Sequence, residues 1–375
     1  MFPLFVHAQQ AQSKTLLTVS SPLPNIDFGV YGLLDVGYRY SDRNVDNAVS
    51  GRWGMDAGMQ STSRVGLKVK TEIAEGFNLG GILERSLKTD TGADGNGWNR
   101  QALVFIQNEK YGKIALGRQL TPSYLLAAKY DFFALNTDAG MDAVYKYVYR
   151  VDNMVSYQSP NWRGLSVLAG YSFNISGDEK TGNDGDISMA FISPTYKNGA
   201  FDLALNYHYY KYKESASSTL ADGADVSKLD AFAMYDFKYF QLSAGYGFSK
   251  ASDYDFVLYD SEGKDTQQFM AGIKIPVYKE WSLVSAYTWR ETDVYNSSEK
   301  AKSSEIAAGI MYDPTEYLKI YLVYSNIINN SHTKNSMLSG GSLGSSVNSG
   351  TGGYQRGFMA GVSFSFDLNL SLRKE

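Results

Sequence analysis

The sequence predicts an all-β fold in which sixteen antiparallel strands close into a transmembrane β-barrel with one loop folded inward. Three observations support this prediction. Apolar and polar residues alternate with a two-residue period in many short segments. The connections between these segments are alternately short and long. The 29 tyrosines and 36 glycines, against 8 prolines, favour strands joined by many turns.

The composition excludes several other classes of protein. With 35 Lys and Arg against 39 Asp and Glu, the chain lacks the positive charge typical of nucleic-acid binding. It has no cysteine, so disulfides and thiolate metal sites are excluded. The three histidines, His7, His208 and His332, lie far apart, and we expect no metal site and no cofactor. No apolar run is long enough for a transmembrane helix, and a mean hydropathy of -0.29 also suits a barrel with a polar interior.

The N-terminal residues 1–12 resemble the end of a secretory signal peptide. Val6, His7 and Ala8 precede Gln9 as a cleavage site would, although the basic region and most of the apolar core are missing. A disordered N-terminus is the alternative interpretation. We expect residues 26–366 to form a single barrel and residues 367–375 to form a C-terminal tail or an extension of the last strand.

Sixteen segments are predicted as strands, and an even number closes an antiparallel sheet without a free edge. They lie near residues 26–40, 63–74, 78–89, 99–109, 113–119, 150–160, 165–174, 186–196, 201–213, 228–238, 241–251, 266–278, 281–294, 303–312, 318–330 and 353–366. The longer polar stretches are expected to be loops at one rim. These are 41–62, 90–98, 175–185, 214–227, 252–265, 295–302 and 331–352.

The alternation also predicts which side chains face the lumen, because a barrel in lipid turns its apolar face outward. The polar faces of the first three segments carry Asp27, Asp35, Arg39, Arg64, Lys68, Lys70 and Glu84. In the fourth segment the same rule places Leu103 and Phe105 on the apolar face, opposite Arg100 and Ala102.

The alternation stops between Lys113 and Arg150. After a strand-like start, about thirty residues mix apolar and aromatic side chains with the acids Asp131, Asp138 and Asp142. We expect this stretch to fold back inside the barrel and to control what passes through it. Its one glycine for a tight tip is Gly140.

Five segments carry a resemblance to a known family: VYGLLDVG (30–37), STSRVGLKVKTEIAEGFNLGGILE (61–84), NRQALVFI (99–106), KYGKIALGRQLTP (110–122) and YRVDNMVSYQSPNWRGLSVLAGYSF (149–173). They resemble the trimeric sixteen-stranded porins of Gram-negative outer membranes, most closely the β-proteobacterial and neisserial branch. The resemblance is dense up to about residue 175 and architectural afterwards. It implies a homotrimer in the outer membrane, surrounded by lipid and lipopolysaccharide, that lets small hydrophilic solutes and ions diffuse passively.

The resemblance also implies a pore constriction in which wall arginines face acids of the third loop. The family's wall arginines match Arg64 in SRVGLK, Arg100 in NRQAL and Arg150 in YRVDNMVSY. Opposed charges across a pore orient dipolar solutes and set ion preference. The alternative interpretation is that these charges only solvate the channel wall.

Other charged residues complete the expected constriction. Lys68, Lys70 and Arg39 should add to its basic side. Glu84 and Asp35 should partly offset it. No motif fixes the loop acids, so Asp131, Asp138 and Asp142 are all candidates. The family normally ends in a C-terminal aromatic residue. Phe366 would match it, but DLNLSLRKE follows.

The sequence also bears on three rival functions: an outer-membrane enzyme, a substrate-selective channel and a structural or adhesive barrel. An outer-membrane lipase would need a serine–histidine pair facing lipid, whereas His208 should face the lumen, and no GxSxG, HExxH or P-loop motif is present, so no enzyme is expected. A substrate-selective channel is the main rival, with Tyr210 and Tyr212 as a candidate sugar-stacking track. A structural or adhesive barrel would lack an open lumen.

The acidic, glycine-rich stretches 90–97 and 178–186 do not match EF-hand spacing and are expected to be solvated loops.

Overall fold

The computed structural model describes residues 15–21, 25–45, 48–93, 95–134, 136–180, 185–213, 223–253, 255, 257, 263–294, 296–333, 335 and 352–374. The segment 1–12, interpreted above as the end of a signal peptide, therefore lies outside the described residues. Among the described residues, no helix has the length and apolar character needed to cross a membrane.

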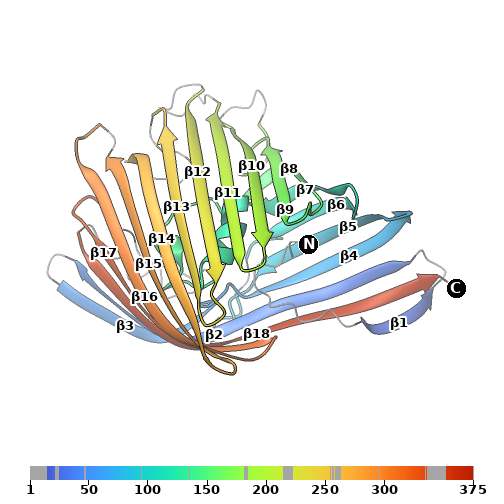
Figure 1. Cartoon of the computed structure of the whole chain (residues 1–375), viewed down its shortest axis with the longest axis horizontal. Helices are drawn as coiled ribbons and strands as arrows, with labels where there is room; N and C mark the ends of the chain where they lie inside the picture. Colours follow the sequence, from blue (N-terminus) through green and yellow to red (C-terminus); the bar gives the residue numbers. More distant parts are fainter. Residues whose placement is uncertain are drawn as a thin grey trace.

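The predicted sixteen-stranded antiparallel barrel is confirmed (Figure 1). Its strands are β2 (Ile26–Val45), β4 (Arg64–Ala74), β5 (Phe77–Ser86), β6 (Gln101–Asn108), β7 (Gly112–Leu120), β8 (Arg150–Gln158), β9 (Leu165–Ser172), β10 (Ile187–Asn198), β11 (Phe201–Tyr212), β12 (Asp225–Asp236), β13 (Gln241–Ala251), β14 (Gly263–Tyr278), β15 (Trp281–Val294), β16 (Lys300–Thr315), β17 (Leu318–Asn329) and β18 (Tyr354–Lys374). Each strand pairs with the next, and β18 closes the ring by pairing with β2 from Tyr354↔Asn44 to Leu372↔Ile26.

Two further strands lie outside this ring. β1 (Thr15–Ser21) runs parallel to the last residues of β18, between Asn369 and Lys374 (Figure 1). β3 (Ala48–Ala57) pairs with the C-terminal part of β2, from Val36 to Val45, while β4 pairs with its N-terminal part, from Ile26 to Leu33. Thus β3 and β4 together form one neighbour of β2 that is interrupted at residues 58–63.

The expectation that 41–62 is a long loop is therefore wrong. Most of this stretch continues β2 and forms β3. Alternating apolar residues in β3 meet aromatic residues across the pair, and the Trp53 ring lies 4.5 Å from the Tyr40 ring and 5.9 Å from the Tyr38 ring. Such cross-strand aromatic contacts stabilise antiparallel pairs. Glycines 51 and 54 obscured the alternation in the sequence.

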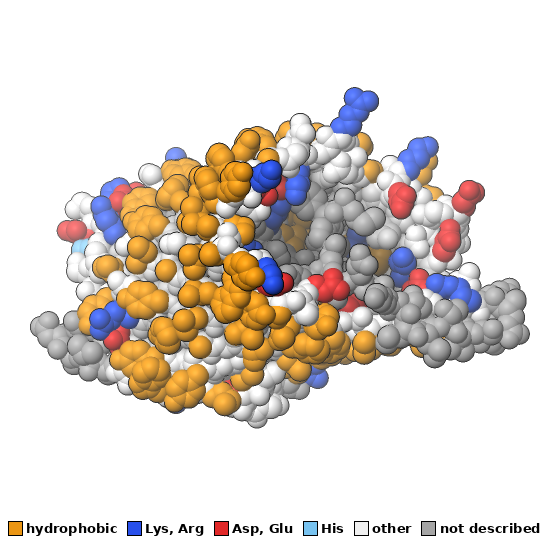
Figure 2. Space-filling view, turned by 60° about the horizontal axis from the view of Figure 1, so that its bottom comes forward, with side chains coloured by type: hydrophobic (Ala, Val, Ile, Leu, Met, Phe, Trp, Pro, Cys, Tyr) orange, Lys and Arg blue, Asp and Glu red, His pale blue; other side chains and the backbone are white. Residues whose placement is uncertain are grey.

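Side chains divide as a membrane barrel requires. Outward-facing apolar residues such as Leu205, Tyr246 and Ile306 are exposed, whereas the alternate positions Asn206 and Asp230 are buried inside. Figure 2 shows hydrophobic side chains spread widely over the outer surface, with charged side chains around the hollowed part of the view.

The predicted orientation of the fourth strand, β6, is wrong, because the side chains expected to face lipid point into the barrel. Leu103 and Phe105 are 7% and 8% exposed and pair with Ile82 and Gly80, on the interior face shared with Glu84, while Val104 faces outward with 56% exposure. Space explains this reversal, because a Cβ atom on Gly80 would lie 2.4 Å from the Phe105 ring. Gly80 thus leaves room for Phe105 inside the barrel. Arg100 precedes β6, which begins at Gln101, so the alternation of the strand does not fix its direction. Its side chain is buried.

The expected inward position of the third loop is confirmed. We call residues 121–149 loop 3, of which 135 lies outside the described residues. Loop 3 contains α1 (Pro122–Tyr130) and a 3₁₀ turn η1 (Met141–Ala143), and α1 packs against β11, β12 and β13. Pro122 at the first helical position and Thr121, whose side chain accepts a bond from the Tyr124 amide at 3.2 Å, begin the helix.

Candidate functional site

Loop 3 is attached along the inner wall of β11 and β12. The carboxylate of Asp230 accepts hydrogen bonds from the hydroxyls of Tyr145 at 2.7 Å and Ser123 at 3.1 Å. The carboxylate of Asp202 accepts one from the Tyr130 hydroxyl at 2.6 Å and pairs with Lys129 at 2.6 Å. These contacts fix both ends of loop 3 because the wall residues face inward at alternate positions of their strands.

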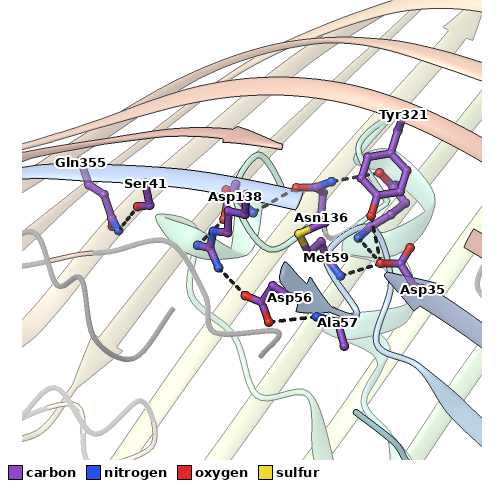
Figure 3. Close-up of polar contacts among 11 residues, drawn as sticks. Asp35, Ser41, Asp56, Ala57, Met59, Asn136, Asp138, Tyr321 and Gln355 are labelled. Atoms are coloured by element: carbon purple, nitrogen blue, oxygen red, sulfur yellow. Dashed lines mark hydrogen bonds and ion pairs between the residues drawn. The ribbon is translucent and has the colours of Figure 1, made fainter. Parts of the chain in front are cut away.

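The tip of loop 3 reaches the opposite wall, at the interruption between β3 and β4 (Figure 3). The Thr137 amide donates to the Met59 carbonyl at 2.7 Å. The Gln60 side chain donates to the Phe133 carbonyl at 2.8 Å and accepts from Asn136 at 2.9 Å. Loop 3 is therefore hydrogen-bonded to β11 and β12 near its ends and to the segment between β3 and β4 at its tip, and Phe133 packs against the wall between them.

Two of the predicted wall arginines share one carboxylate. Nε of Arg100 lies 2.6 Å from Oε1 of Glu84, and Nε of Arg64 lies 3.8 Å from Oε2. Glu84 also accepts a bond from the Tyr31 hydroxyl at 3.1 Å. Glu84 thus lies among the arginines on the wall, where it orients and partly neutralises them.

Arg150 lies at the start of β8, next to loop 3. Its guanidinium carbon is 5.2 Å from the centre of the Tyr124 ring, a cation–π distance. Nε and one terminal nitrogen of Arg150 have no hydrogen-bond partner, and no described acid forms an ion pair with it. Its positive charge is therefore uncompensated within the described part of the chain.

Lys68 is not brought to this cluster. Its Nζ pairs with Asp367 of β18 at 2.7 Å, nearer the short-turn end of the barrel. Arg39, expected on the basic side, is only 1% exposed and pairs with two acids, Asp56 at 3.1 Å and Asp138 of loop 3. Figure 3 labels the two acids.

The three candidate loop acids have different hydrogen-bond and ion-pair partners. Asp131 accepts bonds from the amides of Phe133 at 2.9 Å and Met141 at 3.0 Å, so it shapes the loop itself. Asp138 forms the ion pair with Arg39. Asp142 accepts a bond from the Tyr149 hydroxyl at 3.0 Å.

A layer of tyrosines separates Asp142 from the wall arginines. The Tyr149 ring lies 5.8 Å from the Tyr124 ring and 5.2 Å from the Tyr147 ring, and Tyr124 in turn faces Arg150. The basic wall and the nearest loop acid therefore face each other through aromatic side chains.

Burial changes the protonation of two loop acids. It raises the pKa of Asp138 to about 6, against the opposing influence of Arg39. Burial, reinforced by the nearby carboxylate of Asp131, raises the pKa of Asp142 to about 7. The negative charge of loop 3 therefore varies near neutral pH.

Some residues of the site were missed by sequence reasoning. Glu305 on the inner face of β16 is 2% exposed, and neither of its carboxylate oxygens has a hydrogen-bond partner among the described residues. The alternation of its segment could have indicated its inward direction. Gln60, Asn136 and Tyr124 carry no such signal, because their contacts arise only when loop 3 folds back.

The remaining candidates lie elsewhere. His208 is buried on the inner face, as expected, and its Nδ1 is 2.9 Å from the Tyr210 hydroxyl. Tyr210 and Tyr212 are packed in an apolar cluster with Phe191 and do not form an open track. Among the described residues, no group of three His, Asp or Glu side chains is placed to hold a metal ion.

Comparisons with known proteins agree with this architecture. The family model described as Gram-negative porin matches residues 4–333. An outer membrane porin protein of Bordetella pertussis is 27% identical over 274 residues, 64% of this chain and 65% of the relative. Outer membrane porin protein 32 of Delftia acidovorans is 27% identical over 227 residues, 57% of this chain. The chain thus spans 65% and 61% of the length of these relatives.

Solved structures show the same fold. An anion-selective porin from Comamonas acidovorans superposes with a TM-score of 0.74 at 20% identity, covering 91% of this chain and all of that one. The trimer form of OmpT from Vibrio cholerae has a TM-score of 0.63 at 17% identity, covering 92% of this chain and all of that one.

Proposed function

Because this chain belongs to the Gram-negative porin family, we propose that it forms a water-filled channel in the outer membrane for passive diffusion of small hydrophilic solutes and ions. The closed sheet supports the proposal, since it satisfies its own backbone in lipid and turns polar side chains inward. The channel performs no catalysis and needs no cofactor.

We further propose that loop 3 and the arginine wall form a constriction that favours anions. The observation that carries this is the imbalance of charge among the described residues, because Arg64 and Arg100 share the carboxylate of Glu84 and Arg150 has no ion-pair partner. The loop acids offset this excess only weakly. Asp138 is paired with Arg39, and tyrosines separate Asp142 from the arginines. A local excess of positive charge raises the concentration of anions in a pore.

Planar-bilayer recordings of the purified chain test both parts. In a potassium chloride gradient we expect stable single-channel currents and a reversal potential of the sign that anion permeation gives. Absence of any conductance would overturn the channel. A cation-selective reversal potential that persists after Arg64, Arg100 and Arg150 are each replaced by glutamine would overturn the assigned role of the arginines.

A substrate-selective channel is the second candidate. Its proposed aromatic track is disfavoured because Tyr210 and Tyr212 are buried in an apolar cluster. Saturable block of the current by one sugar would support it.

We also propose that the protein is a homotrimer surrounded by outer-membrane lipid and lipopolysaccharide. The trimer form of a protein with the same fold supports this assembly. Native mass spectrometry in detergent would show a mass three times that of the chain, and a monomer at all concentrations would contradict the proposal.

A further inference from the structure

The strand that neighbours β2 is interrupted at residues 58–63, which separate β3 from β4. We call this interruption the break in the wall. β2 pairs Leu33 with Arg64 and Val36 with Ala57, so the intervening residues leave the ladder. Asp35 stabilises the break, because its Oδ1 accepts bonds from the amide of Met59 at 2.7 Å and the hydroxyl of Tyr321 at 3.0 Å (Figure 3). The break thus has its own buried hydrogen bonds and exposes polar groups to the lumen that an intact ladder would use.

The tip of loop 3 uses these groups. The carbonyl of Met59 accepts the Thr137 amide, and Gln60 bonds both Phe133 and Asn136. All three contacts are neutral hydrogen bonds. Gln60 and Asn136 are buried, so these bonds are shielded from water, and each makes a modest net contribution to holding the tip.

Arg39 adds a charged contact to this docking site. Its guanidinium joins three elements, because it extends from β2, lies 3.1 Å from Asp56 of β3 and pairs with Asp138 of loop 3. Arg39, Asp56 and Asp138 are all at most 1% exposed. A buried ion pair of this kind is nearly all-or-none, since separating one partner leaves the other charge buried without compensation.

The position of this contact matters because the ends of loop 3 are attached elsewhere. Its residues bonded to β11 and β12, on the other side of the barrel, are Ser123, Lys129, Tyr130 and Tyr145. Between these attachments loop 3 follows the inner wall, where Phe132 lies near Gly272 of β14 and Phe133 packs among apolar residues of β15 to β18. How closely the tip stays against this wall sets how much of the lumen is open.

We propose that Arg39 is a positioning residue that holds the tip of loop 3 against the break in the wall and thereby keeps the channel in its conducting state. Arg39 acts through Asp138 and does not itself contact the permeating solute. This inference rests on the proposed channel function and goes beyond it, since it concerns the stability of the open state and not ion preference.

The test compares two substitutions that each remove one carboxylate from the same arginine. Asp138→Asn cuts the link to loop 3, whereas Asp56→Asn leaves that link intact and removes the partner on the wall. In single-channel recordings at fixed voltage, Asp138→Asn and Arg39→Met are expected to raise the rate of transitions to closed or partly closed states by on the order of tenfold. Asp56→Asn is expected to stay close to the unmodified protein.

Arg356→Met serves as a second control. It removes an arginine–aspartate pair, Arg356 with Asp42 at 2.7 Å, that joins β18 to β2 without touching loop 3. If Arg39→Met does not fold, Arg39→Lys replaces it, because lysine keeps the charge but cannot bridge two carboxylates in the same fork geometry. Thermal unfolding of every variant is measured alongside, so that altered gating is separated from general loss of stability.

The outcomes are distinct. Lack of conductance in the unmodified protein would overturn the channel function. Conductance in the unmodified protein with equal closing rates in Asp138→Asn and Asp56→Asn would overturn the inference alone. So would a closing rate in Arg356→Met as high as in Arg39→Met.

Discussion

Nε of Arg100 donates a hydrogen bond of 2.6 Å to the carboxylate of Glu84, within the wall of the barrel. Sixteen residues separate the two in sequence, and they meet because β5 and β6 are paired so that Glu84 lies opposite Gln101. The pair places the one carboxylate of the basic wall directly between two arginines. If the arginines set the ion preference as proposed, this carboxylate should affect it as well.

Replacing Glu84 by Gln is expected to strengthen anion preference. The substitution removes one negative charge and leaves Arg64 and Arg100 uncompensated. A unit charge near a permeating ion is worth about 1 kcal/mol in water, with opposite sign for anions and cations, so the anion-to-cation permeability ratio changes by up to about 30-fold. Reversal potentials measure the ratio. Asp313→Asn, which removes the partner of Lys319 beside a short turn, is the control and should change it little.

Replacing Arg150 by Gln is expected to reduce the anion-to-cation permeability ratio by a similar factor, up to about 30-fold. The expected effect is direct because no described acid pairs with Arg150, so its loss leaves no carboxylate exposed. Arg163→Gln, at an exposed turn between β8 and β9, is the matched control. Equal shifts in the two variants would mean that overall charge, and not the site, sets the preference.

The ion preference is expected to depend on pH. Asp142 and Asp138 have pKa values raised to about 7 and about 6, so both gain protons as the pH falls from 8 to 5. Protonation removes negative charge from loop 3, and anion preference should therefore rise on acidification. Reversal potentials recorded at equal pH on both sides measure this. In Asp142→Asn the part of the change between pH 8 and 6 should disappear, and an unchanged profile would contradict the role of Asp142.

Gly80→Ala is expected to destabilise the barrel by about 1–3 kcal/mol, because the added methyl group would collide with the Phe105 ring. Urea unfolding from detergent micelles provides the measurement. Gly81→Ala is the matched control, since its nearest neighbour, the Leu103 carbonyl, would lie 3.4 Å away. Phe105→Leu in the Gly80→Ala background should recover part of the loss if the ring causes it.

The sequence predicted the strands well because their signal is local. A two-residue alternation needs only neighbouring side chains to be apolar or polar, and each of the sixteen predicted segments overlaps one strand of the ring. The alternation failed at 41–62, where glycines hid β3, and in the fourth strand. There, room inside the barrel opposite Phe105 is provided by Gly80, a residue of a different strand.

By itself, the sequence determined the barrel, the inward direction of loop 3 and the arginines expected on its wall. The tertiary structure alone decided which charges meet. In that structure Glu84 lies beside Arg100, Asp138 forms an ion pair with Arg39, and the tip of loop 3 contacts the break at 58–63. The physical reason is that alternation is encoded along the chain, whereas partners depend on strand register and on closure of the sheet. Closure brings β2, β17 and loop 3 together, although Asp35 and Tyr321 lie 286 residues apart.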